Sequence, residues 1–231
     1  MKEVMLEQSQ RTYLPAAGRD SFLPLYDLLT KLTGADQARK ILVGQANLRP
    51  GQRVLDLGCG TGTLAVLIKR LYPSVTVVGL DPDPRALARA RRKAARASLS
   101  VRFDQGFSDE LPYAEASFDR VFSSFMLHHL QPGEKQKTLR EVRRVLQPGG
   151  SFHLLDFGGP KSGANGFLAH VVHSSHRLKD NSEDQVLALM RQARFQEPRV
   201  AGHQTVLFGH ADAVYYQGAV PASKLDAAAY R

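Results

Sequence analysis

Residues 54–64 read VLDLGCGTGTL. In this stretch a short apolar run is followed at once by Gly58, Gly60 and Gly62, and a helical pattern begins directly after them. A strand, a glycine-rich turn and a helix bring the amides of the helix N-terminus close to a ligand. The stretch therefore predicts a ligand-binding loop at the edge of a parallel sheet.

Strand-like runs alternate with helical patterns around this loop. We expect strands at residues 53–57, 75–80, 101–104, 119–123 and 151–157, and helices at 20–33, 35–47, 62–71, 84–97, 133–146 and 183–193. The runs at 200–208 and 213–220 leave no room for a helix between them and predict an antiparallel hairpin. The fold class is α/β: a doubly wound, Rossmann-like, seven-stranded sheet of five parallel strands plus the C-terminal hairpin, with helices on both faces.

The charge is concentrated in one segment. The formal net charge is +9, and residues 85–98 read RALARARRKAARAS. Leu87, Ala90 and Ala94 recur at helical spacing, which favours a surface helix whose arginines form a solvated face. An anionic partner for this helix is the alternative. Cys59 is the only cysteine, so an internal disulfide is excluded, and we expect a small loop side chain rather than a nucleophile.

Two carboxylates narrow the choice of ligand. A phosphate-binding P-loop needs a lysine that does not follow this loop, and the dinucleotide pattern G-x-G-x-x-G fails at Thr63. Asp56 would repel a pyrophosphate but suits an ammonium group. Asp81 ends the next strand, where a carboxylate grips a ribose diol. A ligand with a ribose, an ammonium and no phosphate is S-adenosylmethionine.

The same stretch resembles motif I of the class I S-adenosylmethionine-dependent methyltransferases. The resemblance continues through residues 79–91, 103–130 and 139–157, and it is strongest toward the small-molecule methyltransferases of ubiquinone and menaquinone biosynthesis. It implies in-line transfer of a methyl group from S-adenosylmethionine to a partly apolar small-molecule acceptor, with S-adenosylhomocysteine as the second product.

The resemblance also implies the cofactor-binding residues, which are Asp56, Gly58, Gly60, Thr61, Asp81, Pro82, Phe107, Ser108 and Ser124. Asp56 and the loop would serve the methionine part, Asp81 the ribose, and Pro82 the adenine. Phe107 departs from the family pattern, which often has aspartate or asparagine there. A phenyl ring can stack on adenine but cannot accept a hydrogen bond from its amino group.

Histidines are the candidate bases, because a methyl acceptor that loses a proton needs one. His128 and His129 follow the fourth strand and are the predicted catalytic pair. Tyr13, Tyr26, His170 and His173 are predicted to line the acceptor pocket. No metal site is predicted, since histidines on one helix do not show convergence.

The chain of 231 residues is expected to form a single domain. It would comprise a helical lid at 1–48, the cofactor-binding core at 49–157, a substrate-covering insertion at 158–182, and the last helix and hairpin at 183–231. Neither a membrane span nor a signal peptide is apparent. We expect a cytoplasmic monomer or homodimer whose membrane contact, if any, is peripheral.

Two other functions compete with this one. The basic charge allows a nucleic-acid methyltransferase, but amino-methylating enzymes of that kind resemble one another in an Asn/Asp-Pro-Pro-Tyr/Phe turn, and residues 123–126 read SSFM. A cofactor-binding protein without activity is the other alternative.

Overall fold

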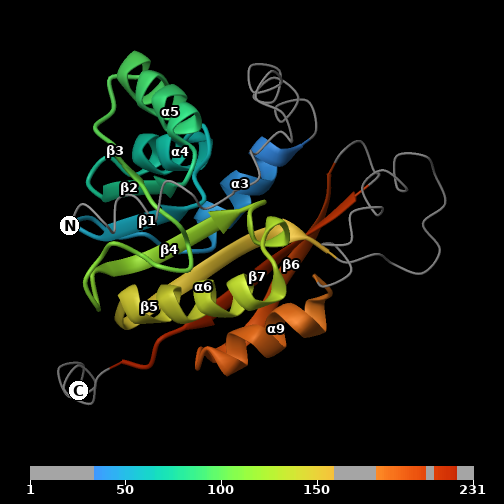
Figure 1. Ribbon diagram of the computed structural model, residues 1–231. Helices are drawn as coiled ribbons and strands as arrows, with labels where there is room; N and C mark the ends of the chain where they lie inside the picture. Colours follow the sequence, from blue (N-terminus) through green and yellow to red (C-terminus); the bar gives the residue numbers. More distant parts are fainter. Residues whose placement is uncertain (1–33, 159–180, 207–210, 223–231) are drawn as a thin grey trace.

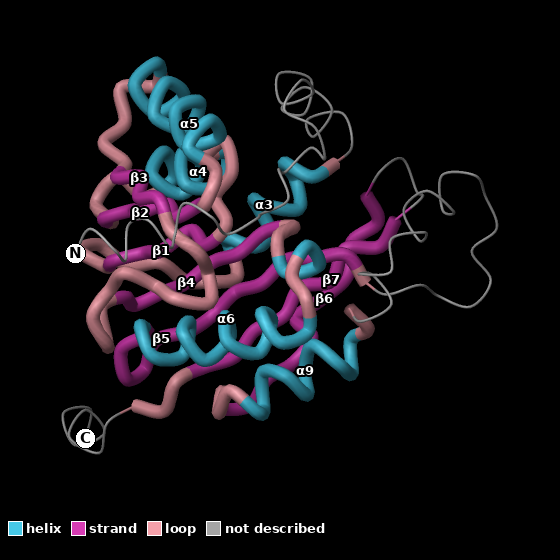
Figure 2. The backbone as a smooth tube through the Cα atoms, in the orientation of Figure 1, coloured by secondary structure: helices cyan, strands magenta, loops and turns pink. Residues whose placement is uncertain are grey.

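A seven-stranded sheet organises the molecule (Figures 1 and 2). The computed structural model describes residues 34–158, 181–206 and 211–222. The strands are β1 Arg53–Leu57, β2 Thr76–Asp81, β3 Arg102–Gln105, β4 Phe118–Ser124, β5 Leu146–Phe157, β6 Gln196–Val206 and β7 Ala211–Ala219. The described helices are α3 Ala35–Gly44, α4 Thr63–Leu71, α5 Pro84–Arg96, α6 Pro132–Val145, α9 Glu183–Gln192 and the 3-10 helix η2 Leu127–His129.

The strand order is β3-β2-β1-β4-β5-β7-β6. Strands β1 to β5 pair in parallel, and β7 pairs antiparallel with both β5 and β6. The predicted architecture is therefore confirmed. The chain runs outward from β1 to β3 and then crosses to β4 on the other side of β1, so the order reverses between β1 and β4. Ligands bind outside the carboxyl ends of the strands at such a reversal.

Helices cover both faces of the sheet, as predicted (Figure 1). The apolar core is split accordingly: one cluster lies under α3, α4 and α5, and the other lies under α6 and α9. Helix α5 buries a narrow stripe consisting of Ala86, Leu87, Ala90 and Ala94. Most of its arginines remain outside this stripe, which agrees with the predicted solvated face.

The element boundaries differ from the prediction mainly in two strands. β5 begins at Leu146 instead of 151, because Leu146 pairs with Phe118 before the register shifts. β6 begins at Gln196 instead of 200 although Pro198 lies within it. The ladder is irregular between Gln196 and Arg199, and β6 is an edge strand, where a proline that donates no hydrogen bond is tolerated.

Several predictions fall outside the described residues. These are the helix at 20–33, most of the N-terminal lid and nearly all of the insertion at 158–182. Their roles stay predictions.

Candidate active site

The glycine loop and the end of β2 form one hydrogen-bonded unit. The backbone amides of Gly58 and Cys59 donate to the carbonyl of Leu80, at 2.8 and 3.0 Å. The Asp81 carboxylate accepts from the Gly60 amide at 2.8 Å and from the Asp83 amide at 3.0 Å. The loop between β1 and α4 is thus held against β2, the strand that ends in Asp81, the residue predicted to bind the ribose.

Two positions of this loop require glycine for different structural reasons. Gly60 has φ +51°, and a Cβ built there would meet no atom within 4 Å. Since Gly60 lines the cavity described next, the missing side chain leaves room for a ligand. Gly62 has φ +76°, and its Cβ would lie 2.8 Å from the Ala90 side chain. Gly62 therefore lets the start of α4 approach α5 closely.

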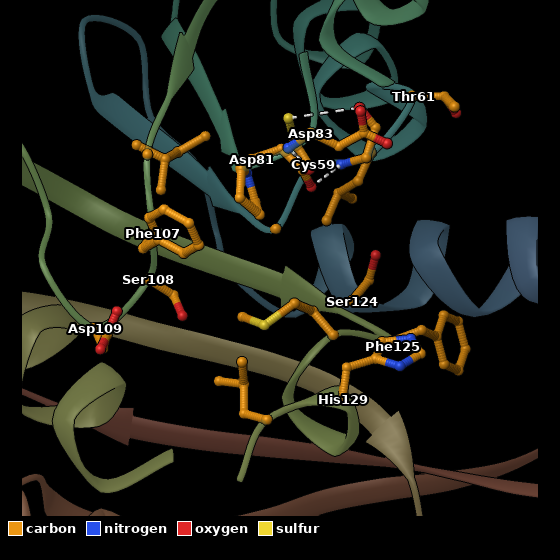
Figure 3. A pocket seen from close by; sticks show the side chains of 18 of the residues that line it. Cys59, Thr61, Asp81, Asp83, Phe107, Ser108, Asp109, Ser124, Phe125 and His129 are labelled. Atoms are coloured by element: carbon orange, nitrogen blue, oxygen red, sulfur yellow. Dashed lines mark hydrogen bonds between the residues drawn. The ribbon is translucent and has the colours of Figure 1, made fainter. Parts of the chain in front are cut away.

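A cavity of about 370 Å³ opens beside the loop, a size within the range of small-molecule sites (Figure 3). It brings together eight of the nine predicted cofactor residues: Gly58, Gly60, Thr61, Asp81, Pro82, Phe107, Ser108 and Ser124. In Figure 3, Asp81 and Phe107 lie toward one end, and Ser124 and His129 lie toward the other. The cavity thus spans the carboxyl ends of β2, β1 and β4.

Asp56 is the exception, because it does not line the cavity. Its side chain is buried behind the loop, and one carboxylate oxygen accepts from the Ala65 amide of α4 at 2.9 Å. The other oxygen, Oδ1, is buried with no hydrogen-bond partner. Burial raises the pKa of Asp56 to about 7. Asp56 can therefore act on a ligand through the helix and the electrostatic field rather than by direct contact.

This raised pKa predicts a pH-dependent stability. The folded state holds the Asp56 proton more tightly than the unfolded state, so the stability that protonation contributes is present below about pH 4 and is lost as the pH rises to about 7. Asp56→Asn removes this dependence. We expect the unfolding free energy of the variant, relative to the wild type, to increase by up to a few kcal/mol between about pH 5 and pH 8. Urea unfolding at both pH values measures it, and a difference that is independent of pH would contradict the assignment.

Lys93 contacts the glycine loop, which the sequence did not predict. Its Nζ donates to Thr63 Oγ1 at 2.7 Å and to Thr61 Oγ1 at 3.1 Å. One cation of the basic helix thus reaches back to the glycine loop and orients its threonines. Its place in a run of arginines had suggested a solvated position or contact with an anionic partner.

Arg39 was also missed, because it belongs to no motif. It comes from α3, its side chain is 6% exposed, and it lines the same cavity. Its Nε donates to Ser124 Oγ at 3.4 Å, and its Nη1 donates to Asp36 Oδ1 at 3.2 Å. The guanidinium carbon lies 5.6 Å from the centroid of the Phe125 ring. A buried cation therefore stands at the Ser124 end of the cavity.

The two predicted catalytic histidines lie side by side on η2. His129 lines the cavity, and the centroid of its ring is 4.0 Å from that of His128. His128 Nδ1 donates to Asp156 Oδ1 at 2.5 Å, and its backbone amide donates to Asp156 Oδ2 at 2.9 Å. Asp156 ends β5 and is fully buried. This carboxylate fixes the orientation and tautomer of His128, which leaves Nε2 as the proton acceptor.

The remaining candidates are placed as follows. Phe107 lines the cavity, and Ser108 Oγ is 2.8 Å from Thr138 Oγ1, a contact that ties the loop after β3 to α6. Cys59 is buried, and burial raises the pKa of its thiol well above the usual value, which argues against a nucleophile.

Tyr13, Tyr26, His170 and His173 lie outside the described residues. Within the described ranges, no group of His, Cys, Asp and Glu side chains could hold a metal ion. In those same ranges, every helix is too short or too polar to cross a bilayer. Cytoplasmic location and oligomeric state stay predictions.

The fold and the cavity define a class of protein. The glycine loop leaves space at Gly60, and a carboxylate at the end of β2 stands beside it. The glycine loop lacks the lysine that a phosphate-binding P-loop contains. This donor set fits an adenosyl ligand that carries an amino acid instead of a pyrophosphate.

Comparisons with known proteins agree with this class. A family model described as a methyltransferase domain matches residues 54–150. Demethylmenaquinone methyltransferase of Deinococcus radiodurans is 40% identical over 160 residues, covering 66% of this chain and 66% of that protein. The protein of the same name from Thermus thermophilus is 40% identical over 151 residues, covering 64% of this chain and 68% of that protein. The chain thus spans about two thirds of the length of these curated relatives.

A solved structure extends the likeness. Phosphoethanolamine N-methyltransferase 2 of Haemonchus contortus, in complex with S-adenosyl-L-methionine, has a TM-score of 0.67 at 19% identity, covering 81% of this chain and 53% of that chain. The chain belongs to the class I S-adenosylmethionine-dependent methyltransferases, in the group similar to the ubiquinone and menaquinone biosynthesis enzymes.

Proposed function

We propose that the protein methylates a small, largely apolar acceptor that carries a dissociable hydroxyl group, as a quinol does. One observation carries this proposal: His129, with the His128–Asp156 pair behind it, lines the cavity together with the apolar side chains of Phe125, Met126 and Leu130. An apolar body would pack on these side chains, and its hydroxyl would meet the histidines.

The roles of the individual residues follow from the chemistry of the cofactor. S-adenosylmethionine supplies a methyl group that its sulfonium already activates, so much of the catalysis is positioning. The loop and Asp81 fix the donor end of the cavity. The histidine pair takes the acceptor's proton, which makes the acceptor electron-rich where it attacks. Asp156 holds His128 in position for this step, so it is a positioning residue.

The relatives' names support the same substrate class. Both curated relatives quoted above are named for demethylmenaquinone, which is a quinone. The nucleic-acid alternative is not favoured. Asp83, Asp109 and Glu134 also line the cavity, and their carboxylates would repel a phosphate backbone.

The acceptor class can be tested with the purified full-length protein and S-adenosylmethionine labelled at the methyl group. We expect label on a short-chain demethylmenaquinol and none on the oxidised quinone, because only the quinol has a proton to give up. Liquid chromatography with mass spectrometry identifies the product. Transfer RNA is the matched polyanionic control. Label on the RNA would contradict the proposal. Absence of label on the quinol would contradict it too, if another metabolite from a lysate becomes labelled.

A further inference from the structure

Helix α5 presents a row of positive charge to the outside of the molecule. The row consists of four arginines at helical spacing: Arg85, Arg89, Arg92 and Arg96. It lies on the side of α5 opposite the buried stripe that packs on the sheet. Neither α4 nor α5 contains an aspartate or a glutamate, and no carboxylate of the described residues pairs with Arg89, Arg92 or Arg96. The charge of this row is therefore not compensated from within the described structure.

This cationic character is confined to one side of the sheet. Helices α4 and α5 lie above the sheet in Figure 1, and α6 and α9 lie below it. Helix α4 adds Lys69 and Arg70 and no anion. Helices α6 and α9 mix both signs, and their carboxylates belong to Glu134, Glu141, Glu183 and Asp184. Such an asymmetry attracts an anionic surface to one side of the molecule and not to the other.

Two exposed aliphatic residues lie on the same side. Among the described residues, the large apolar residues exposed to solvent are Ile41 of α3, at 38%, and Leu71 of α4, at 51%. Each directly follows an exposed cation, Lys40 or Arg70. Helices α3, α4 and α5 pack on one apolar cluster and so form one layer. Cations beside aliphatic groups match a lipid surface, because phosphates attract the cations while apolar groups enter the headgroup boundary. The phosphate backbone of a nucleic acid attracts the cations alone.

The cavity lies at the end of this layer where two of its helices begin. Thr63 is the first residue of α4, Asp83 is the N-cap of α5, and both line the cavity. A molecule docked through this layer would therefore hold its cavity close to the lipid.

We propose that the outer surface of α3, α4 and α5 docks on a bilayer that contains anionic phospholipids. The choice of a bilayer rests in part on the proposed function, because an apolar quinol partitions into lipid. The arginine row of α5 supplies the electrostatic attraction, and Ile41 and Leu71 supply apolar contact at the headgroup boundary. The sequence left an anionic partner for α5 open as the alternative to a solvated face, and this surface is that partner.

Cosedimentation of the full-length protein with lipid vesicles tests the docking, with neither cofactor nor acceptor present. The vesicles consist of phosphatidylcholine alone or of phosphatidylcholine and phosphatidylglycerol in equal parts. We expect binding to the anionic vesicles only, and weaker binding at high salt. Replacing Arg89, Arg92 and Arg96 together with glutamine should lower the partition coefficient by roughly 100-fold, because each arginine near an anionic surface contributes a factor of about five.

The matched control removes three exposed cations from the opposite side of the sheet, by the substitutions Lys137→Gln, Arg140→Gln and Arg191→Gln in α6 and α9. This variant has the same net charge as the first and should bind anionic vesicles almost as tightly as the wild type. An equal loss in both variants would overturn the proposal, by showing that net charge decides and not this surface.

The substitution Leu71→Ser separates a bilayer from a nucleic acid. It should weaken vesicle binding several-fold, because an apolar contact is lost, and leave any binding of transfer RNA unchanged. A wild type that does not bind anionic vesicles would overturn the proposal. If it binds transfer RNA instead and the arginine variant loses that binding, the surface is a nucleic-acid site. Neither result bears on the quinol proposal, since no acceptor is present, and failure to methylate a quinol would leave the vesicle result in place.

Discussion

Replacing His128 with alanine is expected to lower kcat by at least about 100-fold while the affinity for S-adenosylhomocysteine stays unchanged. The magnitude is that of general base catalysis by a positioned side chain, about 10²- to 10⁴-fold. The affinity should not change because the contacts of His128 are with Asp156, His129 and Phe157 and not with the glycine loop or Asp81. Steady-state kinetics with the short-chain demethylmenaquinol proposed above measures kcat, and calorimetry measures the affinity.

Two further measurements separate a base from a structural histidine. Added imidazole should restore part of the rate of His128→Ala, since the free ring can occupy the vacated place and accept the proton. Asp156→Asn should also lower kcat. The amide of asparagine can donate as well as accept a hydrogen bond, so it no longer fixes Nδ1 as the donor, and the orientation of the ring is lost.

A second histidine–carboxylate pair in the same chain provides the control. His203 Nε2 lies 3.0 Å from Glu183 Oε1, and the His203 side chain is 49% exposed. His203→Ala removes the same kind of histidine–carboxylate hydrogen bond away from the cavity and should leave kcat unchanged. A wild-type kcat in His128→Ala, or a loss that imidazole does not restore in a folded variant, would count against the proton transfer.

Asp81→Ala is expected to weaken the binding of S-adenosylhomocysteine by about two orders of magnitude. Two charge-assisted hydrogen bonds to the ribose would be lost, worth roughly 2–4 kcal/mol together. The structure adds a second reason: the same carboxylate holds the Gly60 amide at 2.8 Å, so its removal loosens the loop.

Asp81→Asn separates these two contributions, because an amide oxygen still accepts from Gly60 while the negative charge is gone. The bond from the Asp83 amide to the other oxygen is lost, so we expect the variant to lose less thermal stability than Asp81→Ala and to bind the ligand with intermediate affinity. Asp104→Asn is the matched control at the end of β3, where the carboxylate binds Arg102 and Tyr113 and does not line the cavity. Unchanged affinity in Asp81→Ala would contradict the assigned ribose contact.

Local patterns were sufficient for the fold. The alternation of apolar runs with helical stripes predicted each described strand and α-helix, with boundaries within five residues, but not the 3-10 helix η2. The four residues before Ala213 predicted the antiparallel hairpin. The glycines and carboxylates of residues 54–81, together with the family resemblance, predicted eight of the residues that line the cavity. Such features are readable because turn conformation and the facing of a helix or strand depend on neighbours in the chain.

Other parts of the site depended on packing between distant segments. Arg39 and Ser124 lie 85 positions apart, and His128 and Asp156 lie 28 apart, so no local pattern connects them. Lys93 and Arg39 look like ordinary helix cations in the sequence, and only the folded structure shows that Lys93 contacts the glycine loop and that Arg39 lines the cavity. Asp56, in contrast, does not line the cavity, and its carboxylate accepts from the Ala65 amide at the start of α4. The orientation of a polar side chain depends on the hydrogen-bond partners that folding brings near it, and the arrangement of the sheet and helices determines those partners.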